Sequence, residues 1–227
     1  MKKLILILFF FICSCKSINY QDVNPTILPN KNLLPAMNTS IDIYNLEASY
    51  SEGYFTAKAS TYGSSYTNKK GFGTSFHKTH MKGKNYKDKR VNDVINIFEK
   101  TVKENISTPY GTKKGTIALT IRYRENDNNK KYRAISLLSF GTATLLGFPW
   151  DKIDETIEIE VEILNNKQET IKIYKEFVSG TSYVAAWWGY NEDDAYRKVS
   201  ADNIKQALEK ISLQINTDAS DIKKKLK

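Results

Sequence analysis

The sequence predicts an α+β fold, in which a mixed or antiparallel sheet of about four to six strands carries two amphipathic helices on one face. Several segments alternate apolar and polar residues with the period of a strand, and two longer segments repeat apolar residues at three-to-four spacing. With 41% hydrophobic and 12% aromatic residues, the chain can build a core. We therefore expect a single domain over residues 39–217, with both helices covering one face of the sheet.

The first strands are predicted from short alternating segments. Residues 41–46 alternate apolar and polar side chains, and residues 54–59 are a candidate partner strand. Residues 117–124 predict a strand with one polar face, and the Asn- and Asp-rich segment 125–130 predicts a turn after it.

The two helices are predicted from apolar stripes. Residues 91–105 carry apolar side chains at helical spacing. A longer helix begins after Asn191, which is followed by acidic residues that suit the first turn of a helix. Residues 218–227 predict a basic flexible tail beyond this helix.

A hairpin is the clearest strand signal. In residues 156–164, isoleucine and valine alternate with three glutamates, and the return strand begins after an Asn-rich turn. If Ile163 faces Ile171, the apolar faces of the two strands coincide. We expect three side chains of this hairpin to lie in the core: Ile159, Val161 and Ile173.

Residues 134–150 contain no charged residue, although glycines and a proline interrupt the segment. One interpretation is a buried strand over residues 135–140 followed by an apolar loop. The other is an exposed apolar patch, formed with the tryptophans Trp150, Trp187 and Trp188, that contacts a membrane or a partner.

The segment 60–90 is basic and contains interleaved tyrosine and phenylalanine residues. A single acid, Asp88, stands against eight cationic residues, which suits an anionic glycolipid such as lipopolysaccharide, or the cell wall. A solvated surface loop without a binding role is the alternative. The cationic residues are Lys69, Lys70, Lys78, Lys82, Lys84, Lys87, Lys89 and Arg90.

No catalytic constellation is evident in the sequence. His77 and His80 are the only histidines, and no further donor completes a metal site around them. The three glutamates of 156–164 lie on one strand face, which indicates a solvated edge. We expect no catalytic residue, no metal and no cofactor, and a hydrolase is the disfavoured alternative.

The N-terminus predicts an export signal over residues 1–14. Two lysines precede the apolar run from Leu4 to Ile12, which is far shorter than the about 20 residues that span a membrane. The end of this run, Ile12-Cys13-Ser14-Cys15, resembles the lipobox of bacterial lipoproteins, which consists of an aliphatic residue, two small residues and a cysteine. The resemblance implies cleavage before Cys15, acylation of this cysteine, and attachment to a membrane. An ordinary secretory signal that leaves a free thiol is the alternative.

The sequence also places the protein in the envelope. Lys16, rather than an acidic residue, follows Cys15, which in Gram-negative lipoproteins favours the outer membrane, here its periplasmic face. The net charge of +9 falls to +7 after signal removal and indicates anionic neighbours, while export argues against nucleic acid. Residues 15–38 form either a tether that reaches roughly 70–80 Å when extended or a strap on the domain.

The order of strands and helices in residues 91–216 is similar to that of small α+β envelope lipoproteins, including peptidoglycan-synthase activators and the curli secretion lipoprotein. The resemblance implies a lipid-anchored, non-catalytic protein that binds an envelope protein, lipopolysaccharide or peptidoglycan. The alternative is a subunit of a membrane-inserted oligomeric secretion or assembly complex, with the segment 134–150 and its flanking strands in the membrane.

Overall fold

A computed structural model describes residues 16–25, 32–42, 46, 89–128 and 130–226. In this part of the chain, four strands form one sheet in sequence order. The strands are β1 (Asn38–Ile41), β2 (Gly115–Asn128), β3 (Asp151–Asn165) and β4 (Thr170–Val184). The first pair is parallel and the other two pairs are antiparallel, which confirms the predicted mixed sheet.

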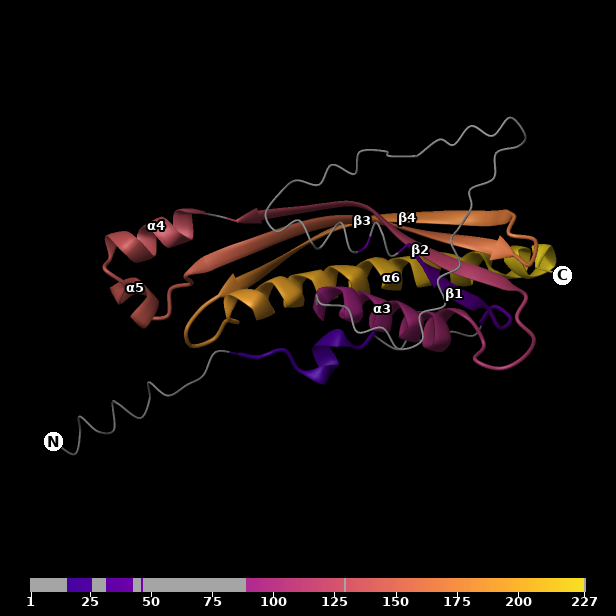
Figure 1. Ribbon diagram of the computed structural model, residues 1–227, viewed down its shortest axis with the longest axis horizontal. Helices are drawn as coiled ribbons and strands as arrows, with labels where there is room; N and C mark the ends of the chain where they lie inside the picture. Colours follow the sequence, from indigo (N-terminus) through magenta and orange to yellow (C-terminus); the bar gives the residue numbers. More distant parts are fainter. Residues whose placement is uncertain (1–15, 26–31, 43–45, 47–88, 129, 227) are drawn as a thin grey trace.

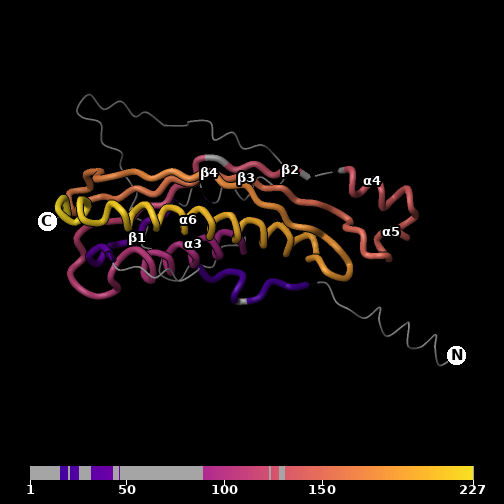
Figure 2. The backbone as a smooth tube through the Cα atoms, turned by 180° about the vertical axis from the view of Figure 1, so that it is seen from behind, coloured from indigo at the N-terminus to yellow at the C-terminus, as the bar shows by residue number. Residues whose placement is uncertain are grey.

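The two long helices, α3 (Lys89–Thr101) and α6 (Glu192–Lys225), lie side by side on one face of the sheet, as predicted (Figure 1). Seen from behind, they cover the strands along most of their length, and two shorter helices extend past one end (Figure 2). The C-terminus lies at the opposite end. The helical elements are η1 (Tyr20–Val23), α3 (Lys89–Thr101), η2 (Val102–Ile106), α4 (Lys130–Leu138), α5 (Thr142–Leu145) and α6 (Glu192–Lys225).

Helix α6 begins at the predicted cap and continues beyond its predicted end. The Asn191 side chain accepts a hydrogen bond from the backbone N–H of Asp194 at 2.8 Å. The expected flexible tail from residue 218 is wrong, because Ala219 and Ile222 continue the buried stripe of the helix. With 34 residues, α6 is about 50 Å long.

The β3–β4 hairpin differs by one residue from the predicted register. Ile163 faces Lys172 rather than Ile171, because the pairing shifts between Ile163 and Leu164. Since side chains alternate along a strand, this shift moves every later residue of β4 to the opposite face.

The shift changes one of the three predicted core residues. Ile159 and Val161 are fully buried against the helices, as expected. Ile173 is 45% exposed, so its placement in the core was wrong. It lies on the outer face of the sheet opposite Glu162, and Tyr174 takes the buried position facing α6.

Two strand boundaries also differ from the prediction. The first strand ends at Ile41 rather than at residue 46, and the Asp42 carbonyl accepts a hydrogen bond from the Leu46 N–H at 3.0 Å. β2 runs through the segment expected to be a turn, because residues 125–128 pair with the extended start of β3. The predicted strand 54–59 lies outside the described residues.

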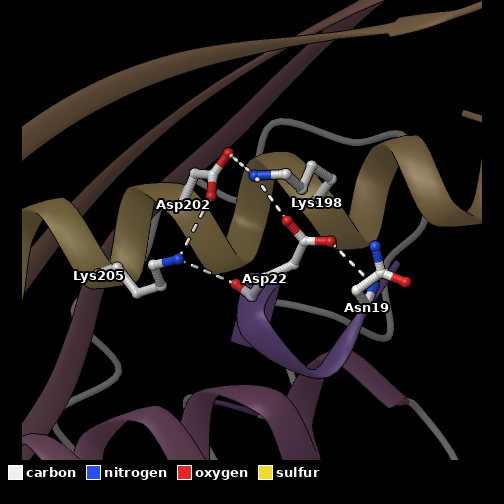
Figure 3. Close-up of polar contacts among 5 residues, drawn as sticks. All are labelled: Asn19, Asp22, Lys198, Asp202 and Lys205. Atoms are coloured by element: carbon white, nitrogen blue, oxygen red, sulfur yellow. Dashed lines mark hydrogen bonds and ion pairs between the residues drawn. The ribbon is translucent and has the colours of Figure 1, made fainter. Parts of the chain in front are cut away.

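Residues 16–25 and 32–42 form an N-terminal strap on the body rather than an extended tether. The side chain of Lys198 lies 3.6 Å from the Asp22 carboxylate, and Lys205 donates to the Asp22 carbonyl at 3.1 Å (Figure 3). Asp202 contacts the ammonium groups of both lysines, and the Asn19 N–H donates to Asp22. These contacts attach the strap to the outer side of α6.

Candidate functional site

The segment between β2 and β3 forms the short helices α4 and α5, so the predicted buried strand over residues 135–140 is wrong. The reason lies in the sheet, because β2 and β3 already pair with each other up to the point where the segment begins. The segment therefore leaves the sheet and projects from its end (Figures 1 and 2).

Large apolar side chains of this projection are exposed. Phe140 is 97% exposed and Leu146 is 90% exposed. Both lie in the segment 134–150, which contains no charged residue. Contiguous exposed apolar side chains of this kind mark interaction surfaces. We call this surface the apolar tip, and it comprises Leu137, Leu138, Phe140, Leu145, Leu146 and Trp188.

The interior of the projection is polar, which reverses the usual arrangement of a helix pair in water. Ser136 is fully buried, and its hydroxyl accepts a hydrogen bond from Thr144 at 3.0 Å. Ser139 donates to the Ser136 carbonyl at 3.0 Å, and Thr142 donates to the Ser139 carbonyl at 2.7 Å. Small hydroxyl residues thus join α4 to α5, while the leucines point outward.

The turn between α4 and α5 holds an exposed aromatic residue in a strained conformation. Phe140 has a φ of 51°, in the left-handed region that favours glycine. Its N–H donates to the Leu137 carbonyl at 3.0 Å, and Gly141 N–H donates to the Ser136 carbonyl at 2.8 Å. This is the Schellman pattern of a helix C-terminus, with phenylalanine at the position where glycine is usual.

Tryptophans from the loop after β4 close the last turn of the projection. The Trp187 indole N–H donates to the Leu145 carbonyl at 3.0 Å, and that of Trp188 donates to the Gly147 carbonyl at 2.8 Å. Trp150, the third predicted tryptophan, is 38% exposed at the start of β3. The structure therefore places the uncharged segment against the tryptophan pair.

An arginine fixes the projection to the body. Arg133 of α4 donates to the carboxylate of Asp151 at 2.7 Å and to that of Glu192 at 2.9 Å. The hydrogen bond to Asp151 is the main cause that raises the pKa of Arg133 above its ordinary value. Sequence analysis missed this group, because its members come from three elements that only the fold brings together.

The chain enters the body beside the apolar tip. Lys16 N–H donates to the Gly189 carbonyl at 2.8 Å, and the Lys16 ammonium lies 5.3 Å from the centroid of the Tyr190 ring. Gly189 directly follows Trp188. Cys15 directly precedes Lys16 in the sequence and lies outside the described residues.

A buried polar network lies in the middle of the body, between the sheet and α6. Glu155 and Arg124 are paired at 2.7 Å, and Ser200 donates to the same carboxylate at 2.7 Å. Asn203 donates to both the carbonyl and the carboxylate of Glu155. These contacts join α6 to β2 and β3, so this network holds α6 on the sheet.

Most of the other predicted site residues lie outside the described part of the chain. Of the eight cationic residues of the basic stretch, the structure describes only Lys89 and Arg90, at the start of α3. His77 and His80 are also outside it. Among the residues that are described, no three His, Cys, Asp or Glu side chains are grouped as metal ligands would be.

An apolar pocket of about 430 Å³ lies near the C-terminal end, far from the projection. Leu34 and Leu226 contribute to its wall, and Lys114 and Lys223 are also among the residues that line it. The pocket lies between the strap and the end of α6.

No family model and no curated protein matches this chain. Two solved structures do. A "putative lipoprotein" from Caulobacter crescentus is 12% identical over 49% of this chain and 71% of that one, with a TM-score of 0.32. A DUF330 family protein from Xanthomonas campestris is 13% identical over 89% of both chains, with a TM-score of 0.30. TM-scores this low carry no argument about fold or function.

No helix within the described ranges has the length and apolar character needed to cross a membrane.

Proposed function

We propose that this chain is a lipid-anchored protein of the bacterial cell envelope that acts by binding a partner and not by catalysis. The observation that carries the proposal is the position of Lys16, whose backbone is hydrogen-bonded to Gly189 of the body. A folded body thus begins one residue after the cysteine of the lipobox-like motif. An acyl group on Cys15 would hold the whole domain, and not only a loose tail, at the membrane.

The proposed partner is an envelope protein or an anionic component such as lipopolysaccharide or peptidoglycan, reached from the outer membrane. Helix α6 runs from the end of the body near the proposed anchor to its far end, a length of about 50 Å. The far end carries the pocket with Lys114 and Lys223, which suits an apolar ligand with a negative group. The basic segment 60–90 remains a second predicted contact for an anionic surface.

We do not propose the membrane-inserted oligomer. That alternative needs membrane-spanning strands from residues 134–150 and their flanks. The structure forms helices α4 and α5 there. Its flanking strand β3 has glutamates on one face, which suits a sheet in water rather than in lipid.

The anchor is tested by fractionating cells that express the wild-type chain, Cys15→Ala or Cys13→Ala. The Cys13→Ala variant is the matched control, because it removes the other cysteine and keeps a small residue in the motif. We expect mass spectrometry to find acylated Cys15 as the mature N-terminus in wild type and control. Cys15→Ala should be soluble or unprocessed, and an unmodified Cys15 in the wild-type protein would refute the proposal.

The binding role is tested by crosslinking in cells that produce the wild-type protein, followed by purification under denaturing conditions. A reproducible envelope partner, lost when Lys114 and Lys223 or the basic residues are changed to serine, is the expected result. Turnover of an envelope substrate that is lost on changing His77 would instead favour a hydrolase.

A further inference from the structure

We propose that the apolar tip inserts into the surface of the same lipid bilayer that holds the acyl chains of Cys15. The end of the molecule that carries α4 and α5 then faces the membrane. The inference rests on the proposed lipid anchor and deepens it. The ligand of the tip is the boundary between headgroups and acyl chains, and the tip is a second, non-covalent membrane contact.

The first argument is position. The residue after the proposed anchor is already attached to the body, because the Lys16 N–H is hydrogen-bonded to the Gly189 carbonyl. Gly189 adjoins Trp188, whose indole is bonded to the Gly147 carbonyl at the base of the tip. An acyl group on Cys15 would therefore hold the membrane close to the tip. Helices α4 and α5 extend beyond the sheet at this same end (Figures 1 and 2).

The second argument is the chemistry of the exposed side chains. Residues 134–150 carry no charge, and the exposed residues Leu138, Phe140 and Leu146 are large and apolar. Trp188 has an apolar ring and a polar N–H, the combination that is enriched where water meets lipid. Interfacial helices bury such a face at the headgroup boundary without crossing the bilayer.

The third argument concerns backbone polar groups, which must find partners inside the protein where water is scarce. The last carbonyls of a helix have no partner within the helix. Here the indoles of Trp187 and Trp188 donate to the carbonyls of Leu145 and Gly147. The buried hydroxyl of Ser136 and the hydroxyls of Ser139 and Thr144 are also bonded within the projection. The large exposed side chains of residues 134–150, among them Leu138, Phe140 and Leu146, are apolar, as lipid requires.

Two of the charged groups at this end are bonded to the body. Arg133 is held by Asp151 and Glu192, and Asp194 is bonded to the N-cap Asn191. Among the described residues, α4 and α5 extend beyond the start of α6 at this end of the sheet (Figure 1). Insertion of the tip does not require these charges to enter the apolar layer.

The chain offers a built-in probe, because its three tryptophans are Trp150, Trp187 and Trp188, all at or beside the tip. Full-length lipidated protein is reconstituted into phosphatidylcholine vesicles, with and without bromine on the acyl chains near the headgroups. We expect tryptophan emission to shift to shorter wavelength relative to detergent-free Cys15→Ala protein, and to be quenched by the brominated lipid. Unquenched emission in acylated, vesicle-bound protein would overturn the inference and leave the anchor proposal intact.

Variants separate insertion from mere closeness to the anchor. Leu138→Ser, Phe140→Gly and Leu146→Ser are combined in one tip variant. The matched control combines Phe177→Ser and Leu213→Ser, which remove exposed apolar side chains from β4 and α6. Both should stay anchored, but only the tip variant should lose the quenching.

Quenching that persists in the tip variant would overturn the inference, since the tryptophans would then be near lipid only because of the anchor. Tip crosslinks to a protein in cells, without quenching in protein-free vesicles, would assign the surface to a protein partner instead. An unmodified Cys15 would overturn both proposals. Circular dichroism melting of the variants confirms that each is folded.

Discussion

Arg124 of β2 and Glu155 of β3 form an ion pair at 2.7 Å, and their side chains are only 3% and 0% exposed. Ser200 and Asn203 of α6 donate to the same glutamate. Charges this deeply buried are tolerated only when they are paired and hydrogen-bonded. The network therefore selects one position of α6 along the sheet.

Removing one partner of this pair should be strongly destabilising. We expect Glu155→Gln to lower the free energy of unfolding by about 3–5 kcal/mol, because Arg124 is left as an uncompensated buried charge. Urea unfolding followed by circular dichroism measures the loss. In the control, Arg124→Met combined with Glu155→Leu should recover part of it, and a double variant less stable than Glu155→Gln would contradict this account.

The close approach of α6 to β4 depends on a glycine. A Cβ at Gly180 would lie 2.3 Å from the Asn203 side-chain oxygen. Gly180→Ala should therefore displace Asn203 from Glu155 and cost about 1–3 kcal/mol. A double-mutant cycle with Asn203→Ala gives the test: the combined loss should be smaller than the sum of the two, and simple additivity would show that the residues are not coupled.

The faces of the β3–β4 hairpin can be distinguished by one substitution made at two positions. Val161 is fully buried, whereas Ile173 is 45% exposed. Val161→Asn should cost roughly 3 kcal/mol or more, because the amide has no partner in the core. Ile173→Asn should cost less than about 1 kcal/mol, the span of strand preferences. If both variants lost the same free energy of unfolding in urea, the result would support the register predicted from the sequence.

The strained turn in the apolar tip makes a prediction in the opposite direction. A non-glycine residue in the left-handed region costs roughly 1–2 kcal/mol, which a glycine would avoid. Glycine loses more conformational entropy on folding than other residues, and this loss offsets part of the gain in stability. Phe140→Gly should therefore raise the free energy of unfolding by up to about 1 kcal/mol. Phe140→Ala is the control, because it removes the ring and keeps the strain. Should both variants be equally destabilised, the ring would have a structural role.

The regular parts of the fold could be predicted from the sequence because each element carries its own period. The alternation of β3 and the apolar stripe of α6 identify their buried faces without knowledge of their neighbours. The same stripe continues through Ala219 and Ile222, so the full length of α6 was also predictable. The hairpin register was not, because one extra residue at the turn moves all later side chains to the other face.

The apolar tip could be predicted only as one of two alternatives. An uncharged segment without a clear period is compatible with burial and with exposure, and the choice depends on which strands pair around it. The Arg133 contacts with Asp151 and Glu192, and the contact of Lys16 with Gly189, join residues far apart in sequence. No local pattern encodes them, although they decide which end of the molecule faces the proposed anchor.

Glu160, which the sequence placed on a solvated edge, is 5% exposed on the outer face of the sheet. Burial alone would raise the pKa of this carboxyl, but hydrogen bonds from Arg122 at 2.5 Å and Lys175 at 3.0 Å outweigh it and hold the pKa below its ordinary value of 4.5. A lowered folded-state pKa contributes stability above the unfolded-state pKa, and this stability is lost as the pH falls through the folded-state value.

We therefore expect Glu160→Gln to be less stable than the wild-type protein at pH 7, with a difference that shrinks as the pH falls below about 4.5. The difference should disappear once the wild-type carboxyl is protonated, because both side chains are then neutral. Urea unfolding at a series of pH values measures it. Lys175→Gln should weaken the pH dependence without abolishing it, since Arg122 remains. A loss from Glu160→Gln that stays constant from pH 7 to acid would show that the charge of this group contributes nothing.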